Sequence, residues 1–400
     1  MTATPSPQSA PSEVMISDCT LREGEQQPGV ILGTSQKLAI AEILGEVGIR
    51  RAEIGTPAVS EGEREAIAAV VDASRIAETI GVCRARTDDV ELAHRCGLWG
   101  VVISSPVSRY QLESKFGWSV SEMVAAAVQA HTAARELGLR TFASAYDTLR
   151  SGRDDIRKLY GELRRQELID GIRIVDTVGI GTPAEVSALV KWCDDEFGLP
   201  IEVHFHDDFG LATANALSAV QAGAGWISSS IAGIGERAGN VPTEEIVAVL
   251  EFLLHVSTGV ELELLGPSFI RAAEVIGVRL QDNRAIIGRN SFRHVSGISI
   301  GGLIRSPLAA QPIEAEAVGR HSEIVLGKMS GGVAIEHVLR SVGIDPATLD
   351  VRGLVEQVKT VAESTRRILS VSDLLRLVSA QEGCAALVDH GQPPEVKSDA

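Results

Sequence analysis

The feature that most constrains the fold is a repeated alternation of short β-rich runs with amphipathic helical stretches from residue 14 to about 258. The alternation predicts strands at 14–20, 51–55, 79–86, 99–106, 140–146, 171–177, 201–207 and 226–233. Strands that alternate with helices pair in parallel and are joined by crossover helices. Eight such units indicate a (β/α)₈ barrel, with an open doubly wound sheet as the alternative. No G-x-G-x-x-G motif follows the first strand, which argues against a dinucleotide-binding sheet.

The pattern changes after Pro267, where the chain becomes Gly-rich and irregular before two more helices are predicted at 349–364 and 371–383. The fold class is therefore α/β: a (β/α)₈ TIM barrel with a C-terminal α/irregular subdomain. We predict a disordered Pro/Ser/Thr/Ala-rich tail at 1–12, the catalytic barrel at 13–265, a linker subdomain that covers the active site at 266–340, a small helical subdomain at 341–390, and a flexible tail at 391–400.

Composition excludes several classes of protein. The net charge of −16 argues against nucleic-acid binding, which needs clustered Lys and Arg. No run approaches the roughly 18 apolar residues that cross a bilayer. The N-terminus has neither the basic nor the apolar region of a signal peptide. The five cysteines are scattered, odd in number and without a CxxC pair. These features predict a cytoplasmic protein with free thiols and no membrane partner.

Polar residues gather where the predicted strands end, which is where this fold places active sites. His204 and His206 are one residue apart on a strand, so both imidazoles face the same side. Strands 7, 8 and 1 are neighbours in a closed barrel, so these histidines can meet Asn240 and the Arg22–Glu23 pair. Two imidazoles and a carboxylate suit a catalytic divalent metal. The alternatives are hydrogen-bonded core histidines and a surface turn at Arg22–Glu23.

Two long motifs resemble those of one enzyme family. The run "DCTLREGEQQPGV" (18–30) is similar to the D-x-T-L-R-[DE]-G-x-Q signature of the α-isopropylmalate/homocitrate synthase family. The runs "HFHDDFGLATANALSAVQAGA" (204–224) and "GIGERAGN" (233–240) resemble its second signature. "EIGTPAVSEGE" (53–63) and "SPVS" (105–108) look most like homocitrate synthases of the nitrogen-fixation type. "VSGISIGGLIRSPL" and "VLGKMSGG" follow the family's C-terminal subdomain, so the resemblance covers about 14–340.

The resemblance implies a metal-dependent Claisen condensation. In such enzymes a divalent metal (Zn, Mn, Mg or Co) holds a 2-oxo acid, acetyl-CoA supplies the enolate, and CoA is released. By resemblance Glu23, His204 and His206 are metal ligands, with Asn240 as a fourth. Arg22 is the catalytic residue that polarises the keto oxygen.

The resemblance also implies a substrate pocket. Thr177 and Ser144 occupy positions that contact the carboxylate of the keto acid, and Gln26 lies beside that pocket. Arg86, at the end of the third predicted strand, reaches the same pocket or forms a surface salt bridge.

Four positions depart from the family pattern: Ser299 and Met329 replace histidines, Ala310 replaces a tyrosine, and Tyr146 replaces a glutamate before Asp147. A serine cannot replace an imidazole as an acid or base near neutral pH. His294 is either a substitute for the missing histidine or a structural residue.

The leading interpretation is a homocitrate synthase-like enzyme that condenses acetyl-CoA with a 2-oxo dicarboxylate. One alternative is a phosphonomethylmalate-type synthase that uses phosphonopyruvate, with Arg109 and Arg150 either meeting the extra anion or remaining solvated surface residues. Others are a metal-dependent lyase or aldolase and a non-catalytic keto-acid binder. By resemblance we expect a homodimer in which the C-terminal unit of one chain covers the barrel of the other.

Overall fold

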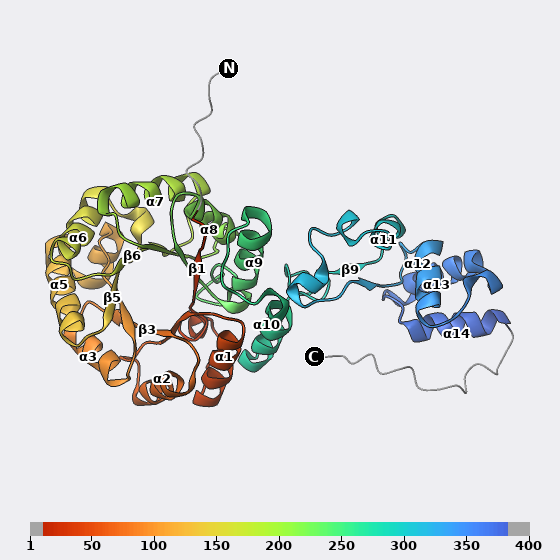
Figure 1. Ribbon diagram of the computed structural model, residues 1–400, viewed down its shortest axis with the longest axis horizontal. Coiled ribbons are helices and arrows are strands. Elements are labelled where there is room, and N and C mark those ends of the chain that lie inside the picture. The colour runs from red at the N-terminus through yellow and green to blue at the C-terminus, as the bar shows by residue number, and fades with distance from the viewer. Residues whose placement is uncertain (1–10, 383–400) are drawn as a thin grey trace, which may run out of the picture. The chain divides into compact units, whose positions relative to one another are not determined.

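The computed structural model describes residues 11–382, and its first unit is a closed barrel of eight parallel strands (Figure 1). The strands are β1 Met15–Asp18, β2 Arg51–Gly55, β3 Glu78–Arg84, β4 Gly100–Ser104, β5 Arg140–Ala145, β6 Gly171–Asp176, β7 Ile201–Phe205 and β8 Trp226–Ser229. Each strand pairs with the next along the chain, and β8 closes the barrel against β1 with Ile16 opposite Ile227. The predicted (β/α)₈ barrel is therefore confirmed.

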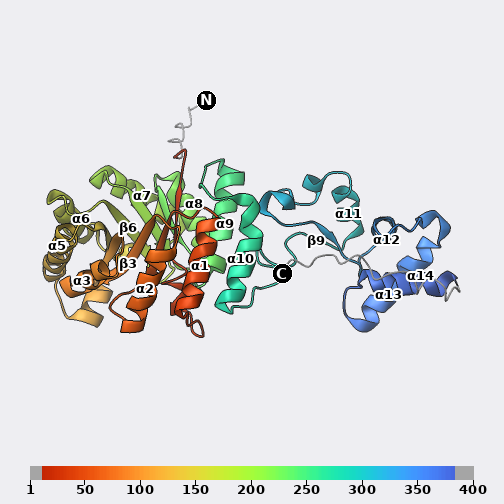
Figure 2. The same cartoon turned by 60° about the horizontal axis from the view of Figure 1, so that its bottom comes forward.

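Helices surround the strands, as Figure 1 shows down the barrel and Figure 2 from the side. They are α1 Thr34–Glu46, α2 Glu61–Ala73, α3 Thr87–Arg95, α4 Arg109–Gln111, α5 Val120–Glu136, α6 Arg153–Arg165, α7 Pro183–Phe197, α8 Ala212–Gln221 and α9 Thr243–Ala248. The ends of α7 follow from its sequence. The Thr182 hydroxyl accepts from the Glu185 N–H, Pro183 is the first helical residue, and Gly198 ends the helix at φ 57°.

The amino-terminal end of the barrel is filled by aliphatic and aromatic side chains around a buried arginine. Ile80, Val102 and Phe142 form an apolar cluster there. The Arg51 guanidinium lies 3.5 Å from the centroid of the Trp226 ring and 4.5 Å from that of Phe142. Cation–π contacts compensate part of the cost of burying this charge.

The first unit extends beyond the boundary predicted at residue 265. Helix α10, Leu262–Ile276, contains Pro267 and lies beside α1 (Figures 1 and 2). The compact barrel unit ends at Leu280, so the predicted boundary falls inside this helix.

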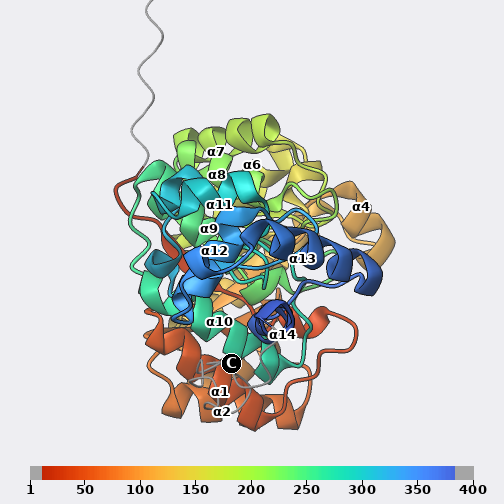
Figure 3. The ribbon, with the colours of Figure 1, turned by 90° about the vertical axis from the view of Figure 1, so that its right-hand side faces the viewer.

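The second unit begins at Gln281 and is drawn in cyan to blue in Figure 3. It is built around one apolar core. Its elements are β9 Arg293–His294, α11 Gly297–Leu303, β10 Glu323–Ile324, α12 Gly332–Ser341, α13 Val351–Thr365 and α14 Val371–Glu382. Ile300 and Leu326 share this core with Ile335, Leu354 and Leu374. The segments predicted as separate subdomains at 266–340 and 341–390 thus contribute to a single core. The tail predicted at 391–400, and most of that predicted at 1–12, lies outside the described residues.

Two further predictions concern cysteines and membrane spans. Cys19, Cys83, Cys96 and Cys193 are free and buried, whereas Cys384 lies outside the described residues. Between residues 11 and 382, no helix has both the length and the hydrophobicity needed to cross a bilayer.

Candidate metal centre

Three buried side chains from opposite ends of the barrel sequence meet at its carboxyl-terminal rim. Glu23 lies in the turn after β1, His204 is on β7, and His206 directly follows β7. One ligand atom from each lies within 4.8 Å of the others. The turn is held by the buried Asp18 carboxylate, which accepts from the Thr20 N–H at 2.9 Å. The fold therefore brings together the three residues that were predicted to be metal ligands.

Asn240, the predicted fourth ligand, lies against this group. It forms a β-bridge with His206, and its Nδ2 is 3.3 Å from His204 Nε2. The other ring nitrogen of His204 is 2.9 Å from the Ser228 hydroxyl, which fixes the orientation of the imidazole. A Cβ at Gly235 would lie 2.0 Å from Asn240 Oδ1. Glycine at 235 therefore permits the close approach of the "GIGERAGN" loop.

The electrostatics of the site favour neutral imidazoles. Burial lowers the pKa of His204 well below its ordinary value, and the charges of His206 and Arg22 add to the effect. Burial also lowers the pKa of His206, although Glu23 opposes this shift. A neutral imidazole has a free lone pair for a metal. Among the described residues, His206 Nδ1 and Asn240 Oδ1 have no hydrogen-bond partner. These donors fit a divalent cation.

Arg22 and Gln26 fix the carboxylate of Glu23. The Arg22 guanidinium donates to Glu23 and also to Glu53, at 2.6 Å from Nε to Oε2. Gln26 Nε2 donates to the same Glu23 oxygen at 2.9 Å. Burial alone would lower the pKa of Arg22, but Glu53 and Glu23 raise it above its ordinary value. Arg22 is therefore a permanent cation directly beside the candidate metal ligands.

Arg22 is the last member of a series of buried ion pairs inside the barrel. We call this series the barrel charge chain, and it consists, in order, of Arg51, Glu202, Arg173, Glu53 and Arg22. Arg173 Nη2 lies 2.5 Å from Glu53 Oε1 and 2.5 Å from Glu202 Oε1. Arg51 Nη1 lies 3.6 Å from Glu202 Oε2. The sequence analysis did not predict the barrel charge chain. The available signal was the presence of charged residues at alternate, inward positions of the otherwise apolar strands β2, β6 and β7.

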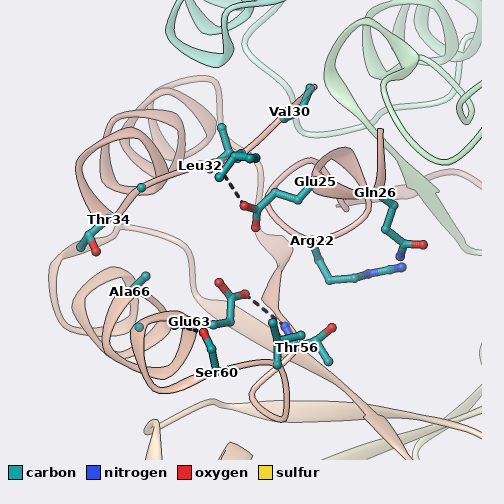
Figure 4. Close-up of a pocket in the computed structure, with 14 residues that line it drawn as sticks. Arg22, Glu25, Gln26, Val30, Leu32, Thr34, Thr56, Ser60, Glu63 and Ala66 are labelled. Carbon is teal, nitrogen blue, oxygen red and sulfur yellow. Dashed lines mark hydrogen bonds between the residues drawn. The ribbon is translucent and has the colours of Figure 1, made fainter. Parts of the chain in front are cut away.

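A cavity of about 680 Å³ opens beside Arg22 and Gln26, between the loop after β1 and the start of α2 (Figure 4). Thr56 and Ser60 place hydroxyls along an otherwise largely apolar wall formed by residues such as Val30, Leu32 and Ala66.

A buried lysine joins the two sides of this cavity. Lys37 Nζ lies 2.7 Å from Glu25 and 2.8 Å from Glu63, which come from the β1 loop and from α2. The Leu32 N–H donates to Glu25 at 2.9 Å, which holds the same loop (Figure 4).

The residues predicted to bind substrate do not all lie in one place. Gln26 contacts Glu23, as described. Ser144 and Thr177 are buried at the ends of β5 and β6, and the Thr177 hydroxyl accepts from the Asp147 N–H at 2.8 Å. Arg86 is exposed and pairs with Asp88 at 2.7 Å, on a different cleft of the rim. The roles of these residues stay predictions.

Arg109 and Arg150 have other partners. Arg150 pairs with Asp147 at 2.8 Å and lies over the Tyr110 ring, whereas Arg109 is exposed near Glu113.

Of the positions that depart from the family pattern, Tyr146 directly follows β5, whereas Ser299 in α11 and Ala310 and Met329 in loops belong to the second unit. His294, considered as a substitute for the missing histidine, lies on β9 of that unit, 3.3 Å from the Gln311 amide oxygen.

Comparisons with known proteins agree with this site. The HMGL-like family model matches residues 13–267, and the model described as homocitrate synthase post-HMGL domain-like matches residues 286–366. Homocitrate synthase AksA of Methanopyrus kandleri is 34% identical over 375 residues, which cover 93% of this chain and 94% of that protein. A probable 2-isopropylmalate synthase of Ignicoccus hospitalis is 36% identical over 361 residues, which cover 90% of each chain. The (R)-citramalate synthase CimA of Methanocaldococcus jannaschii is 36% identical over 370 residues, which cover 92% of this chain and 75% of that protein.

Solved structures support the fold. HMG-CoA lyase of Bacillus subtilis superposes with a TM-score of 0.61 at 24% identity, covering 68% of this chain and 97% of the lyase. The lyase from Pseudomonas aeruginosa gives 0.59 at 22% identity, covering 68% and 96%. The chain therefore belongs to the HMGL-like family. Within that family it belongs to the group that contains homocitrate, 2-isopropylmalate and citramalate synthases.

The barrel charge chain predicts a large loss of stability when its central cation is removed. Arg173→Met leaves Glu53 and Glu202 buried with one cation fewer, which should lower the free energy of unfolding by about 3–5 kcal/mol. The tryptophans, at 99, 118, 192 and 226, all lie in the barrel unit, so urea unfolding followed by their fluorescence reports on the barrel. The control is Arg157→Met on the surface of α6, expected to cost less than about 1 kcal/mol. Equal losses of unfolding free energy in both variants would contradict a stabilising role of the barrel charge chain.

The metal site predicts a specific loss of metal binding. His206→Ala removes one of two buried imidazoles, so the variant should retain less than a tenth of the metal that the unaltered protein binds after dialysis against excess Mn²⁺ or Zn²⁺, as measured by elemental analysis. His294→Ala, which alters a histidine of the second unit, is the matched control and should bind as much metal as the unaltered protein. Full metal content in His206→Ala would show that the imidazole is not a ligand.

Proposed function

We propose that this chain condenses acetyl-CoA with a 2-oxo acid and releases CoA, in the manner of homocitrate synthase acting on a 2-oxo dicarboxylate. The observation that carries the proposal is the buried Glu23–His204–His206 group with the Arg22 guanidinium beside it. Fold alone would not separate this activity from others, because the HMGL-like barrel also serves lyases. The curated relatives, which are homocitrate, 2-isopropylmalate and citramalate synthases, support condensation over cleavage.

Each residue of the site has a defined task under this proposal. Glu23, His204, His206 and the Asn240 amide would hold the cation. A divalent cation bound there supplies Lewis acidity toward the keto and carboxylate oxygens of a 2-oxo acid. Gln26 keeps the Glu23 carboxylate in place through its 2.9 Å hydrogen bond. Ser228 does the same for the His204 ring.

Arg22 stabilises the charge that develops during condensation. A new carbon–carbon bond forms between the acetyl methyl carbon, which has lost a proton, and the keto carbon. The π electrons of the keto group move to its oxygen, which becomes an alkoxide and then takes up a proton, and this balances the proton lost from the methyl carbon. Arg22 is held from both sides by Glu53 and Glu23, so its cation is fixed in place before the reaction begins. Such preorganised charge contributes strongly to catalysis because nothing must reorient as the alkoxide forms. Water then cleaves the thioester and CoA leaves with a proton on sulfur.

The identity of the 2-oxo acid, and therefore of the product, is part of the proposal. A homocitrate synthase of Frankia sp. is 36% identical over 367 residues. Isopropylmalate and citramalate synthases are equally similar, so overall identity does not select a substrate. The expected homodimer also stays a prediction.

Release of CoA tests the activity. The metal-loaded protein is mixed with acetyl-CoA and, in separate reactions, pyruvate, 2-oxoisovalerate, oxaloacetate, 2-oxoglutarate or phosphonopyruvate. Free thiol is followed with a chromogenic reagent, and the product mass is determined. We expect at least one acid to release CoA in step with an alkylmalate-type product. No CoA release with any acid or metal would refute the proposal.

The role of Arg22 predicts a kinetic defect. Arg22→Gln removes the cation at the developing alkoxide, so kcat should fall at least 100-fold. Metal content, measured on the same sample, should stay within twofold of the unaltered protein, because the metal ligands are other residues. A kcat within tenfold of the unaltered enzyme would make Arg22 a structural residue only.

A further inference from the structure

Lys37 is a buried cation in an unfavourable place. Its side chain is fully shielded from solvent. It is the fourth residue of α1, near the end of the helix where the dipole disfavours positive charge. Taking an ammonium out of water is costly, and an apolar side chain in its place is often at least as stable. Stability is therefore a weak reason for a cation here, and the partners of Lys37 are the better guide to its use.

The ammonium of Lys37 contacts acceptors from different segments of the barrel unit. Nζ lies 2.7 Å from Glu25 Oε2, in the short helix Gly24–Gln26, and 2.8 Å from both carboxylate oxygens of Glu63 in α2. It also donates to the Ile54 carbonyl oxygen of β2 at 3.3 Å. Figure 4 shows the two carboxylates pointing toward one another at the cavity beside Arg22. Lys37 therefore joins the loop after β1 to the end of β2 and to the start of α2.

The loop after β1 and strand β2 also hold Arg22. The Arg22 guanidinium donates to Glu23 in that loop and to Glu53 on β2. Glu53 directly precedes Ile54, whose carbonyl oxygen accepts from Lys37. Lys37 thus binds next to both carboxylates that fix the position of Arg22.

Glu25 connects Lys37 to the candidate metal ligand Glu23. The other carboxylate oxygen of Glu25 accepts the Leu32 N–H at 2.9 Å, so one side chain holds both ends of the loop. Gln26, the next residue, donates its side-chain amide to Glu23 Oε2 at 2.9 Å and its backbone N–H to the Glu23 carbonyl oxygen at 3.0 Å. A displacement of Glu25 therefore moves Gln26 and the Glu23 carboxylate with it.

We infer that Lys37 is a positioning residue for Arg22. Its contacts with Glu25 and with the Ile54 carbonyl oxygen set the separation between the loop after β1 and the end of β2, and Arg22 lies between the carboxylates that these two segments carry. Lys37 is shielded from solvent, so it touches no substrate itself. The inference rests on the proposed function, in which Arg22 stabilises the developing alkoxide.

Steady-state kinetics at saturating metal test this inference. Lys37→Met keeps a long side chain but removes the charge, so the loop after β1 loses its anchor. We expect kcat and kcat/KM to fall together, about 10- to 100-fold, because a misplaced Arg22 loses interactions made mainly in the transition state.

Arg135→Met is the matched control for a purely structural ion pair. Arg135 is a partly buried cation of α5 that pairs with Asp170 at 3.1 Å, just before β6 and therefore at the opposite end of the barrel from the metal centre. This variant should change neither kinetic parameter by more than twofold. Equal effects of Lys37→Met and Arg135→Met on kcat would overturn the inference.

A double-variant cycle tests whether Lys37 acts through Glu25. Glu25→Gln keeps an oxygen for the Leu32 N–H but removes the charge that faces Lys37, so kcat should fall in this variant as well. Once Lys37 is gone, the same change has no partner to lose. The double variant Lys37→Met/Glu25→Gln should therefore have a kcat within about twofold of that of Lys37→Met. Losses that multiply would overturn the inference.

Amide hydrogen exchange and Mn²⁺ affinity test the inference without the reaction. In the metal-free protein, Lys37→Met should speed exchange in peptides from residues 19–33, whereas Arg135→Met should leave that segment unchanged. The Kd for Mn²⁺ should rise about 10-fold in Lys37→Met, because the loop that carries Glu23 is no longer anchored. Both results are expected even if the unaltered protein releases no CoA, so a failure of the proposed function is distinguishable from a failure of this inference.

Glu25→Gln makes the test independent of whether Lys37→Met folds. The Glu25 side chain is partly exposed at the cavity, so its replacement is tolerated more easily than that of Lys37. Faster exchange at residues 19–33 and weaker Mn²⁺ binding are expected for this variant too. Unchanged exchange in that segment, or an unchanged Kd for Mn²⁺, would overturn the inference.

Discussion

The structure depends on an alternating series of buried charges inside the barrel. Arg51, Glu202, Arg173 and Glu53 lead from the aromatic end of the barrel to Arg22. Removing any of these groups from water is costly, and the opposite charges on either side compensate that cost, together with the cation–π contacts of Arg51. In the structure each of these charges lies next to groups of opposite charge. That arrangement holds Arg22 against Glu23 before substrate or metal arrives, which is the condition for electrostatic catalysis without reorganisation.

Local contacts around the ligands complete the candidate metal centre beside these charges. The Asp18 carboxylate forms the turn that carries Glu23, and burial raises the pKa of that carboxyl to about 7. The missing side chain at Gly235 lets Asn240 approach His204. The barrel order brings these loops together although Glu23 and Asn240 are far apart in sequence.

Local patterns in the sequence predicted more of the fold than of the site. The strands and the caps of α7 follow from periodicity and local chemistry, so they could be predicted. The meeting of Glu23 with His204 and His206 followed from barrel closure. The ion pairs of Arg173 could not be assigned, because their partners lie on strands that are distant in sequence. The contact between Lys115 and Tyr146 depends on how a long loop folds over β4 and β5, which periodicity does not encode. The single core of the second unit was missed because its Gly-rich segment has no clear period, although part of it forms α11.

The central claim is that Glu23, His204 and His206 form a metal centre that receives a 2-oxo acid. Visible absorption of the Co²⁺-loaded protein tests this most directly, because the d–d bands of Co²⁺ respond to its ligands. The account predicts saturation at one Co²⁺ per chain and a change in band position and intensity when a 2-oxo acid is added without acetyl-CoA. A spectrum that shows no stoichiometric Co²⁺ binding, or one that no 2-oxo acid alters, would contradict it.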